Sequence, residues 1–140
     1  MTDVKRLLFV CVENSNRSQM AEAFGRLFGG VNVEVFSAGS RPSGRVNSKA
    51  VDAMKALGYD LTKHQSSSLE DLPDVTFDAV VTMGCGDACP QIQTKLRDDW
   101  SIPDPKTLPA DEFAEVRDMI AAKVTALLGQ LGVESSSPIL

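Results

Sequence analysis

The chain has 140 residues, 43% of them hydrophobic and 24% charged, and these ordinary values for a globular domain exclude the disordered and fibrous classes. A formal net charge of -5 and the lack of a basic stripe in the sequence argue against a nucleic-acid partner. The first apolar run, residues 7–12, is too short to span a membrane and has no small-residue cleavage site after it. We therefore expect one cytoplasmic domain over residues 1–133, a flexible tail over residues 134–140, and no membrane partner.

A buried strand followed by an anion-binding loop is predicted near the N-terminus. Residues 7–12 are apolar without alternation, as in a parallel strand buried on both faces. After a polar stretch, residues 17–28 carry apolar side chains on one helical face, until Gly29 and Gly30 end the pattern. A loop between a buried strand and a helix N-terminus gathers backbone N–H groups, so this stretch predicts an oxyanion site.

Cys11 and Arg17 give this loop its chemistry. The positive environment favours the thiolate form of Cys11, which makes it the candidate nucleophile. The planar fork of Arg17 can hold two oxygens of a tetrahedral anion, and the Ser18 hydroxyl can donate to the Cys11 sulfur. A structural cysteine near a solvated arginine is the alternative, but the strand-loop-helix context favours catalysis. The predicted oxyanion-binding residues are those of the loop: Val12, Glu13, Asn14, Ser15, Asn16, Arg17 and Ser18.

The rest of the chain predicts three more strands and two more helices. The valine-rich second strand precedes a turn, the third is a buried apolar run, and the fourth is a short edge strand. The first of the two helices begins after the N-cap Asn47 and ends at Gly58, and the second carries a long apolar stripe. The predicted strands cover residues 31–36, 77–83 and 97–102, and the last helix includes residues 113–128.

Two further cysteines follow the third predicted strand. Ligand crevices of open parallel sheets lie at the carboxyl ends of the strands, so we expect Cys11 and Cys85 to share one crevice. Cys89 lies four residues after Cys85. A regular helix would hold their Cβ atoms ~5 to 6 Å apart, whereas a disulfide needs about 3.8 Å. Gly84 and Gly86 allow a non-helical, mobile segment, which suits redox chemistry.

No metal site is predicted. Zinc would need two ligands besides Cys85 and Cys89, and the sequence offers only His64 and Cys11. His64, the only histidine of the chain, is expected to be a loop residue and not a catalytic base.

Asp104 is the remaining candidate for catalysis. It lies between Pro103 and Pro105, which restrict the backbone on both sides and aim the carboxyl group. Taken alone, Asp104 fits an ordinary turn aspartate equally well.

These motifs together resemble the low-molecular-weight protein tyrosine phosphatases, and within them the thiol-dependent arsenate reductases. The resemblance lies in four segments that occur in order: Cys11-x2-Asn14-x2-Arg17-Ser18, then Gln19 to Glu22, Ser37 to Gly39, and Asp104-Pro105. It implies an α/β fold of three layers, with a four-stranded parallel sheet flanked by helices. It also implies that Cys11 is the nucleophile and that Asp104 is the general acid.

Two departures from the phosphatases favour the arsenate reductases. Lys106 and Thr107 stand where the phosphatases tend to carry an aromatic pair, and residues 41–45 contain no aromatic side chain. The segment that contains Cys85 and Cys89 resembles the redox segment of the arsenate reductases. The resemblance therefore implies arsenate reduction through a Cys11 adduct and a disulfide relay. A phosphatase, or an oxyanion-binding or redox-sensing module, is the alternative.

The resemblance also implies the ligands and the reductant. Arsenate is the expected substrate, with phosphate and sulfate as competing oxyanions. We expect no tightly bound cofactor and an external thiol reductant, thioredoxin first. The spacing of Cys85 and Cys89 is three residues shorter than in the best-known thioredoxin-coupled members, so glutaredoxin with glutathione and a mycothiol-type thiol stay open as donors.

Overall fold

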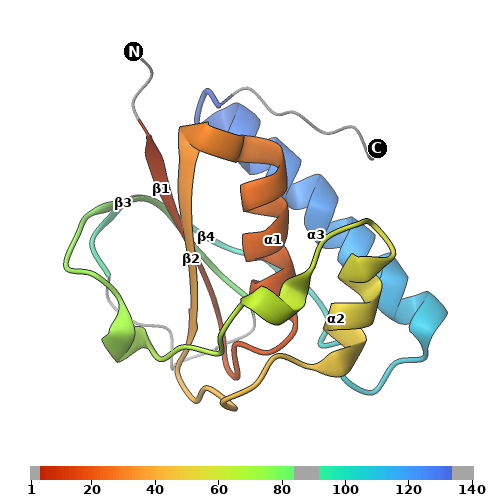
Figure 1. Cartoon of the computed structure of the whole chain (residues 1–140). Helices are drawn as coiled ribbons and strands as arrows, with labels where there is room; N and C mark the ends of the chain where they lie inside the picture. Colours follow the sequence, from red (N-terminus) through yellow and green to blue (C-terminus); the bar gives the residue numbers. More distant parts are fainter. Residues whose placement is uncertain (1–3, 84–91, 134–140) are drawn as a thin grey trace.

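A computed structural model describes residues 4–83 and 92–133 (Figure 1). Within these residues, four parallel strands form one sheet in the order β2-β1-β3-β4, as the sequence predicts for an α/β protein. The strands are β1 Lys5–Cys11, β2 Val33–Gly39, β3 Phe77–Thr82 and β4 Thr94–Asp99. The helices are α1 Arg17–Gly29, α2 Ser48–Lys55 and α3 Ala110–Gln130, with short 3-10 helices η1 Gly30–Asn32, η2 Leu61–Lys63 and η3 Leu69–Asp71.

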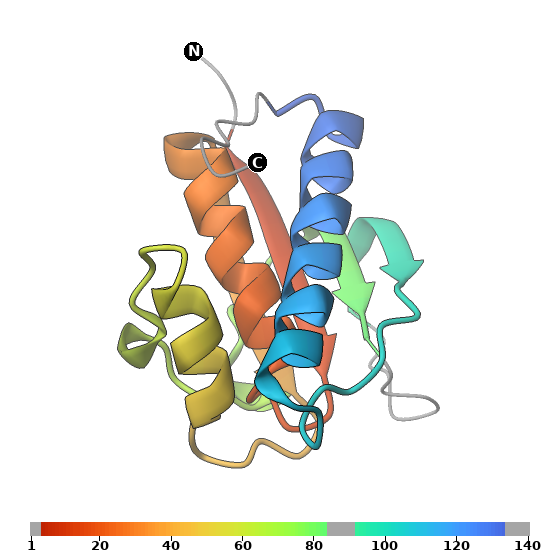
Figure 2. The same ribbon diagram turned by 90° about the vertical axis from the view of Figure 1, so that its right-hand side faces the viewer.

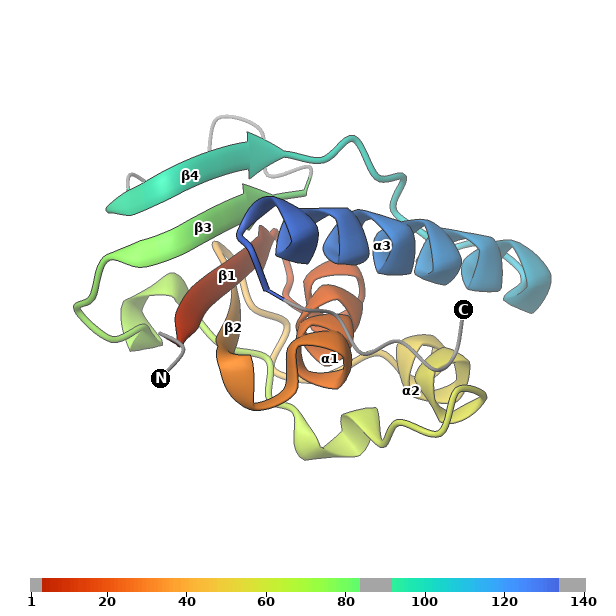
Figure 3. The same ribbon diagram turned by 90° about the horizontal axis from the view of Figure 1, so that it is seen from above.

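The two faces of the sheet are covered differently. Helices α1 and α3 lie side by side across one face, with α2 beside them (Figures 2 and 3). Side chains alternate along β1, so Leu7 and Phe9 join the core under the helices, while Leu8 and Val10 join a smaller apolar cluster on the other face. The smaller cluster includes Leu69 of η3. Burial of β1 on both faces explains its unbroken apolar sequence.

The second strand begins and ends later than predicted. Gly30 has a φ of 55° and begins η1, so the chain does not become extended until Val33. Ser37 and Gly39, which the sequence placed in a turn, belong to the strand because residues 37–39 pair with residues 9–11 of β1. The correction matters for the site, since it carries β2 alongside the predicted anion-binding loop.

The fourth strand lies three residues earlier than predicted. It pairs with β3 from Phe77 opposite Thr94 to Thr82 opposite Asp99. The apolar Trp100, which the sequence placed inside the strand, lies after it and packs on Phe9 with ring centroids 5.8 Å apart. Trp100 is therefore a core residue of the connection that leads to Asp104.

Several predictions fall on residues outside the described part of the chain. Cys85 and Cys89 belong to the segment 84–91, and the predicted tail is residues 134–140. The domain boundary at residue 133 stays a prediction. None of the helices in the described residues is long and apolar enough to cross a membrane.

Candidate active site

The loop between β1 and α1 lies at the carboxyl end of the sheet. β1 ends at Cys11, and α1 begins at Arg17. Cys11 is 4% exposed, and Asn14 and Ser18 are fully buried. The loop is therefore a folded part of the core.

Hydrogen bonds turn the carbonyl groups of this loop away from its centre. Each carbonyl of residues 12–16 has a partner: Val12 accepts from Arg41 N–H, Glu13 from Ser43 N–H, Asn14 from the Gln19 side chain, Ser15 from Asn47 N–H and Asn16 from Met20 N–H. By contrast, the backbone N–H groups of residues 13–17 have no acceptor within the described protein. Donors left unpaired beside a helix N-terminus form the electrostatic basis of an anion site.

Two residues allow the tight path of the loop. Asn14 has a φ of 51°, the left-handed region that asparagine tolerates, as the loop sequence suggested. Gly39 of β2 packs directly on the loop, because a Cβ atom there would lie 2.5 Å from the Val12 carbonyl oxygen. A larger residue at position 39 would displace the loop.

The cavity at this loop brings Cys11, Arg17 and Asp104 together. It has a volume of about 300 Å³ and is lined by Cys11, Val12, Glu13, Ser15, Asn16, Arg17 and Asp104.

 The Arg17 guanidinium donates to the Ile102 carbonyl oxygen over 2.9 Å, which ties the Asp104 connection to the loop. The predicted nucleophile, anion-binding arginine and acid thus share one cavity.

Asp104 and Glu13 are linked through Lys106. The backbone N–H of Lys106 donates to Asp104 Oδ1 over 3.1 Å, and its ammonium group lies 3.3 Å from Glu13 Oε2. These contacts join the two walls of the cavity at its rim. They orient the Asp104 carboxyl group, which is itself exposed.

The other predicted loop residues divide into two groups. Four of them line the cavity: Val12, Glu13, Ser15 and Asn16. Asn14 and Ser18 lie behind it, where Asn14 Nδ2 donates to Ser18 Oγ over 2.8 Å and Ser18 Oγ lies 2.8 Å from Cys11 Sγ. The predicted contact between Ser18 and the Cys11 sulfur is therefore present.

A second cavity of about 360 Å³ adjoins the first and shares Glu13 and Ser15 with it. Its remaining lining residues are Ser43, Arg45, Val46, Asn47, Ser48 and Lys106. None of these described lining residues is aromatic, so they offer no ring to stack on a phenyl group.

The described chain reaches this site a second time at the end of β3. The backbone N–H of Met83 donates to the Val10 carbonyl oxygen over 2.8 Å, one residue before Cys11. Cys85 and Cys89 follow shortly after Met83 and lie outside the described residues. Within residues 4–83 and 92–133, no group of three His, Cys, Asp or Glu side chains is placed to hold a metal ion.

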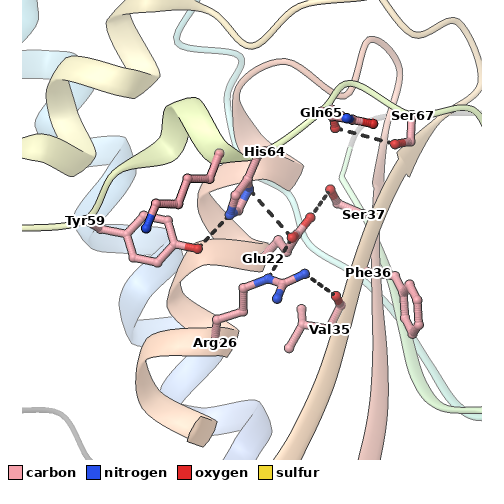
Figure 4. A pocket seen from close by; sticks show the side chains of 10 residues that line it. Glu22, Arg26, Val35, Phe36, Ser37, Tyr59, His64, Gln65 and Ser67 are labelled. Atoms are coloured by element: carbon pink, nitrogen blue, oxygen red, sulfur yellow. Dashed lines mark hydrogen bonds and ion pairs between the residues drawn. The ribbon is translucent and has the colours of Figure 1, made fainter.

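Sequence reasoning missed a polar cluster behind the loop. Figure 4 shows Tyr59, His64, Glu22, Arg26 and Ser37 converging at a cavity of about 380 Å³. The Glu22 carboxylate accepts from Ser37 Oγ over 2.6 Å and from Arg26 Nε over 2.8 Å. Glu22 and Ser37 belong to segments that carry the family resemblance, but nothing in the sequence connected them with Tyr59 and His64.

Burial sets the ionisation of two members of this cluster. It lowers the pKa of His64 below its ordinary value, against the opposing effect of the Glu22 carboxylate. Burial likewise raises the pKa of Tyr59. The lowered pKa keeps the His64 ring neutral near pH 7. His64 lies in a loop, as predicted, but its side chain is packed inside the structure and is only 6% exposed.

Comparisons with known proteins agree with this geometry. The family described as low molecular weight phosphotyrosine protein phosphatase matches residues 6–137. The chain is 40% identical over 126 residues to arsenate reductase 2 of Staphylococcus saprophyticus, which covers 87% of this chain and 95% of that protein. It is also 40% identical over 124 residues to arsenate reductase 1 of Staphylococcus epidermidis, covering 86% of this chain and 92% of that protein.

Solved structures give the same grouping. An arsenate reductase in the phosphate binding state superposes with a TM-score of 0.83 at 31% identity, covering 91% of this chain and 98% of that chain. A thioredoxin-dependent arsenate reductase from Corynebacterium glutamicum superposes with a TM-score of 0.75 at 30% identity, covering 93% of this chain and 63% of that chain. The chain therefore belongs to the low molecular weight phosphotyrosine protein phosphatase family, within the group that includes the arsenate reductases.

Proposed function

We propose that this protein is an arsenate reductase that uses Cys11 as its nucleophile. The observation that carries the proposal is the cavity that joins Cys11, Arg17 and Asp104 at a loop whose N–H donors have no acceptor among the described residues. Staphylococcal arsenate reductases about 40% identical over most of the chain support arsenate as the oxyanion. Phosphate and sulfate, which are also tetrahedral, are proposed as competing ligands.

The first step forms a bond between sulfur and arsenic. The Cys11 thiolate attacks arsenate held by the loop N–H groups and the Arg17 guanidinium. Asp104 donates a proton to the departing oxygen, which leaves as water. Arsenic is still in the +5 state in this adduct, and no electrons have yet been transferred.

Cys85 and Cys89 are proposed to complete the reduction. The Cys85 thiolate attacks the Cys11 sulfur, a disulfide forms, and the electron pair of the sulfur-arsenic bond stays on arsenic, which leaves as arsenite in the +3 state. Cys89 then attacks Cys85 and releases Cys11 as a thiolate. The position of Met83 beside Val10 supports this proposal, because the chain leading to Cys85 begins next to the strand that ends at Cys11.

An external dithiol is proposed to reduce the disulfide between Cys85 and Cys89. Thioredoxin is the first candidate, and a similar fold is found in a thioredoxin-dependent arsenate reductase. Glutaredoxin with glutathione and a mycothiol-type thiol are the alternatives. A cycle that needs free thiols requires a reducing compartment, so we place the protein in the cytoplasm.

Phosphatase activity is the second candidate function. The family match and the pairing of Cys11 with Asp104 in one cavity favour it. The adjoining cavity argues against a phosphotyrosine substrate, because its lining holds no aromatic side chain. An oxyanion-binding or redox-sensing module without catalysis would not need Asp104 in the cavity.

The test measures arsenite formation with thioredoxin, thioredoxin reductase and NADPH, beside hydrolysis of p-nitrophenyl phosphate by the same sample. We expect arsenate-dependent NADPH oxidation in the unmodified protein. Cys11→Ser should abolish both activities, whereas Cys85→Ser should abolish only arsenite formation. Cys89→Ser should release a single arsenite per enzyme and then stop, since Cys11 stays in a disulfide.

The matched serine variants separate the candidates. One outcome would refute the arsenate reductase proposal and support the phosphatase. In that outcome only Cys11→Ser loses hydrolysis of p-nitrophenyl phosphate, and no arsenite forms with any of the three thiol donors. Repeated turnover by Cys89→Ser would refute the three-cysteine relay while leaving arsenate reduction intact.

A further inference from the structure

We propose that Gln19 is a positioning residue that sets the direction of a hydrogen-bond chain ending at the Cys11 sulfur. The chain runs from Tyr59 through His64, Gln19, Asn14 and Ser18 to Cys11, and every donor in it points toward the sulfur. The inference rests on the proposed function in one respect, the role of Cys11 as the nucleophile.

Backbone groups determine how the Gln19 amide is oriented. Gln19 Nε2 lies 2.9 Å from the Asn14 carbonyl oxygen and 2.9 Å from the Gln65 carbonyl oxygen. A carbonyl oxygen can only accept, so the NH₂ end of the Gln19 amide must face this way. Its Oε1 atom then faces the opposite side, toward His64.

A backbone group also determines the orientation of Asn14. The N–H of Ser67 donates to Asn14 Oδ1 over 2.7 Å. Gln19 Nε2 lies 3.0 Å from the same oxygen, and since its two N–H groups face three acceptors, one of them is shared between two acceptors. A backbone N–H can only donate, so the oxygen of the Asn14 amide must lie here. Asn14 Nδ2 therefore points to Ser18 Oγ, 2.8 Å away.

With Asn14 oriented in this way, the Ser18 hydroxyl proton has a single acceptor among the described side chains. Ser18 Oγ already accepts from Asn14, and the Cys11 sulfur, 2.8 Å away, is its only other partner among the described side chains. The hydroxyl therefore donates to Cys11. A donor aimed at the sulfur stabilises the thiolate, which is the reactive form.

The outer half of the chain continues in the same direction. His64 Nδ1 lies 2.9 Å from Gln19 Oε1 and 3.6 Å from Glu22 Oε2, and since both atoms are acceptors, Nδ1 carries the proton. In the neutral ring, Nε2 then accepts from the Tyr59 hydroxyl over 2.6 Å. Successive hydrogen bonds with the same direction polarise one another, so the outer residues reinforce the donor at Cys11.

The burial of Gln19 supports a role in this chain. Its side chain is fully buried on α1, among residues that are mostly apolar. A buried amide without partners is unfavourable, yet both ends of this one are paired. The hydrogen bonds it makes explain why a polar residue occupies this position.

The first test uses the single histidine of the chain, which gives one unambiguous imidazole signal in a long-range ¹H–¹⁵N NMR spectrum of the intact protein. We expect a neutral ring protonated at Nδ1 near pH 7. A ring protonated at Nε2 alone would reverse the outer bonds and overturn the proposed direction.

The second test measures the Cys11 thiolate directly, by ultraviolet absorbance and by the pH dependence of alkylation, in protein that carries Cys85→Ser and Cys89→Ser. Gln19→Met removes the amide with little change in side-chain length. We expect the midpoint of the Cys11 titration, the pH at which half of the cysteine is thiolate, to rise by about 0.5 to 1 pH unit. Alkylation below the midpoint should slow by about 3- to 10-fold to match.

Gln65→Met is the matched control, because it makes the same change but keeps the backbone carbonyl that Gln19 uses. It should leave the midpoint unchanged. A folded Gln19→Met protein with the midpoint of this control would refute the proposal, and if Gln19→Met does not fold, the NMR spectrum still decides. Neither measurement uses arsenate, so failure here is distinguishable from failure of the proposed reductase activity.

Discussion

Gly39→Ala is predicted to displace the loop between β1 and α1, the proposed anion-binding loop. A Cβ atom at this position would lie 2.5 Å from the Val12 carbonyl oxygen and 3.0 Å from the Asn14 backbone nitrogen. Both neighbours are backbone atoms, so no side-chain rotation relieves the overlap. A carbon and a carbonyl oxygen in contact are about 3.3 Å apart, so the loop or β2 must move by roughly 0.8 Å.

Such a displacement affects binding more than folding. Overpacking of this kind destabilises proteins by about 1 to 3 kcal/mol. A misplacement of about 1 Å at a site that positions reacting groups can reduce the rate about 100-fold. We therefore expect the affinity for phosphate and the rate of arsenate reduction to fall by at least about 10-fold in protein that is still folded.

The assay combines calorimetric titration with phosphate, arsenite formation, and urea unfolding. Gly129→Ala is the control, since a Cβ atom there meets nothing within 4 Å, and we expect it to leave binding unchanged and stability equal or slightly higher. Phosphate affinity and turnover in Gly39→Ala equal to those of the control would refute the argument that Gly39 permits the path of the loop.

Three further outcomes are expected. Arg17→Lys loses the planar fork and its hydrogen bond to Ile102, so the affinity for phosphate, measured by titration, should fall by about 10-fold or more. An unchanged affinity would contradict the proposed role of Arg17 in holding the anion. Burial lowers the pKa of His64, so its protonation is less favourable in the folded state than in the unfolded one, and the free energy of unfolding should fall as the pH drops below about 6.5. Urea unfolding of His64→Gln should lack this part of the pH dependence. Identical pH profiles of stability for His64→Gln and the unmodified protein would contradict this prediction. Phe9→Ala removes a fully buried ring beside Trp100 and should lower the free energy of unfolding by about 3 to 5 kcal/mol, and a loss below about 1 kcal/mol would contradict its place in the core.

The local sequence predicted the strand, the loop and the helix around Cys11 well. An unbroken apolar run indicates a strand buried on both faces, and the structure buries β1 in this way. Asn47 was predicted as an N-cap, and its side chain accepts from Lys49 N–H over 2.8 Å. These features follow from neighbouring residues, so a short stretch of sequence is enough to reveal them.

The limits of two strands depended on their partners. The local sequence predicts a turn at residues 37–39, but these residues pair with β1. It likewise predicts that Trp100 belongs to a strand, but Trp100 lies beyond the end of β4. Pairing register depends on residues far away in the chain, so composition alone does not determine where a strand ends.

Local patterns in the sequence place a cysteine and an arginine in one loop and an aspartate between two prolines. Folding then brings Asp104 into the cavity of Cys11 and connects His64 with the loop through Gln19. Local patterns do not reveal these contacts, because they join residues that are far apart in the chain. Gln19 and His64 are 45 residues apart, and a hydrogen bond over that separation exists only once the chain has folded.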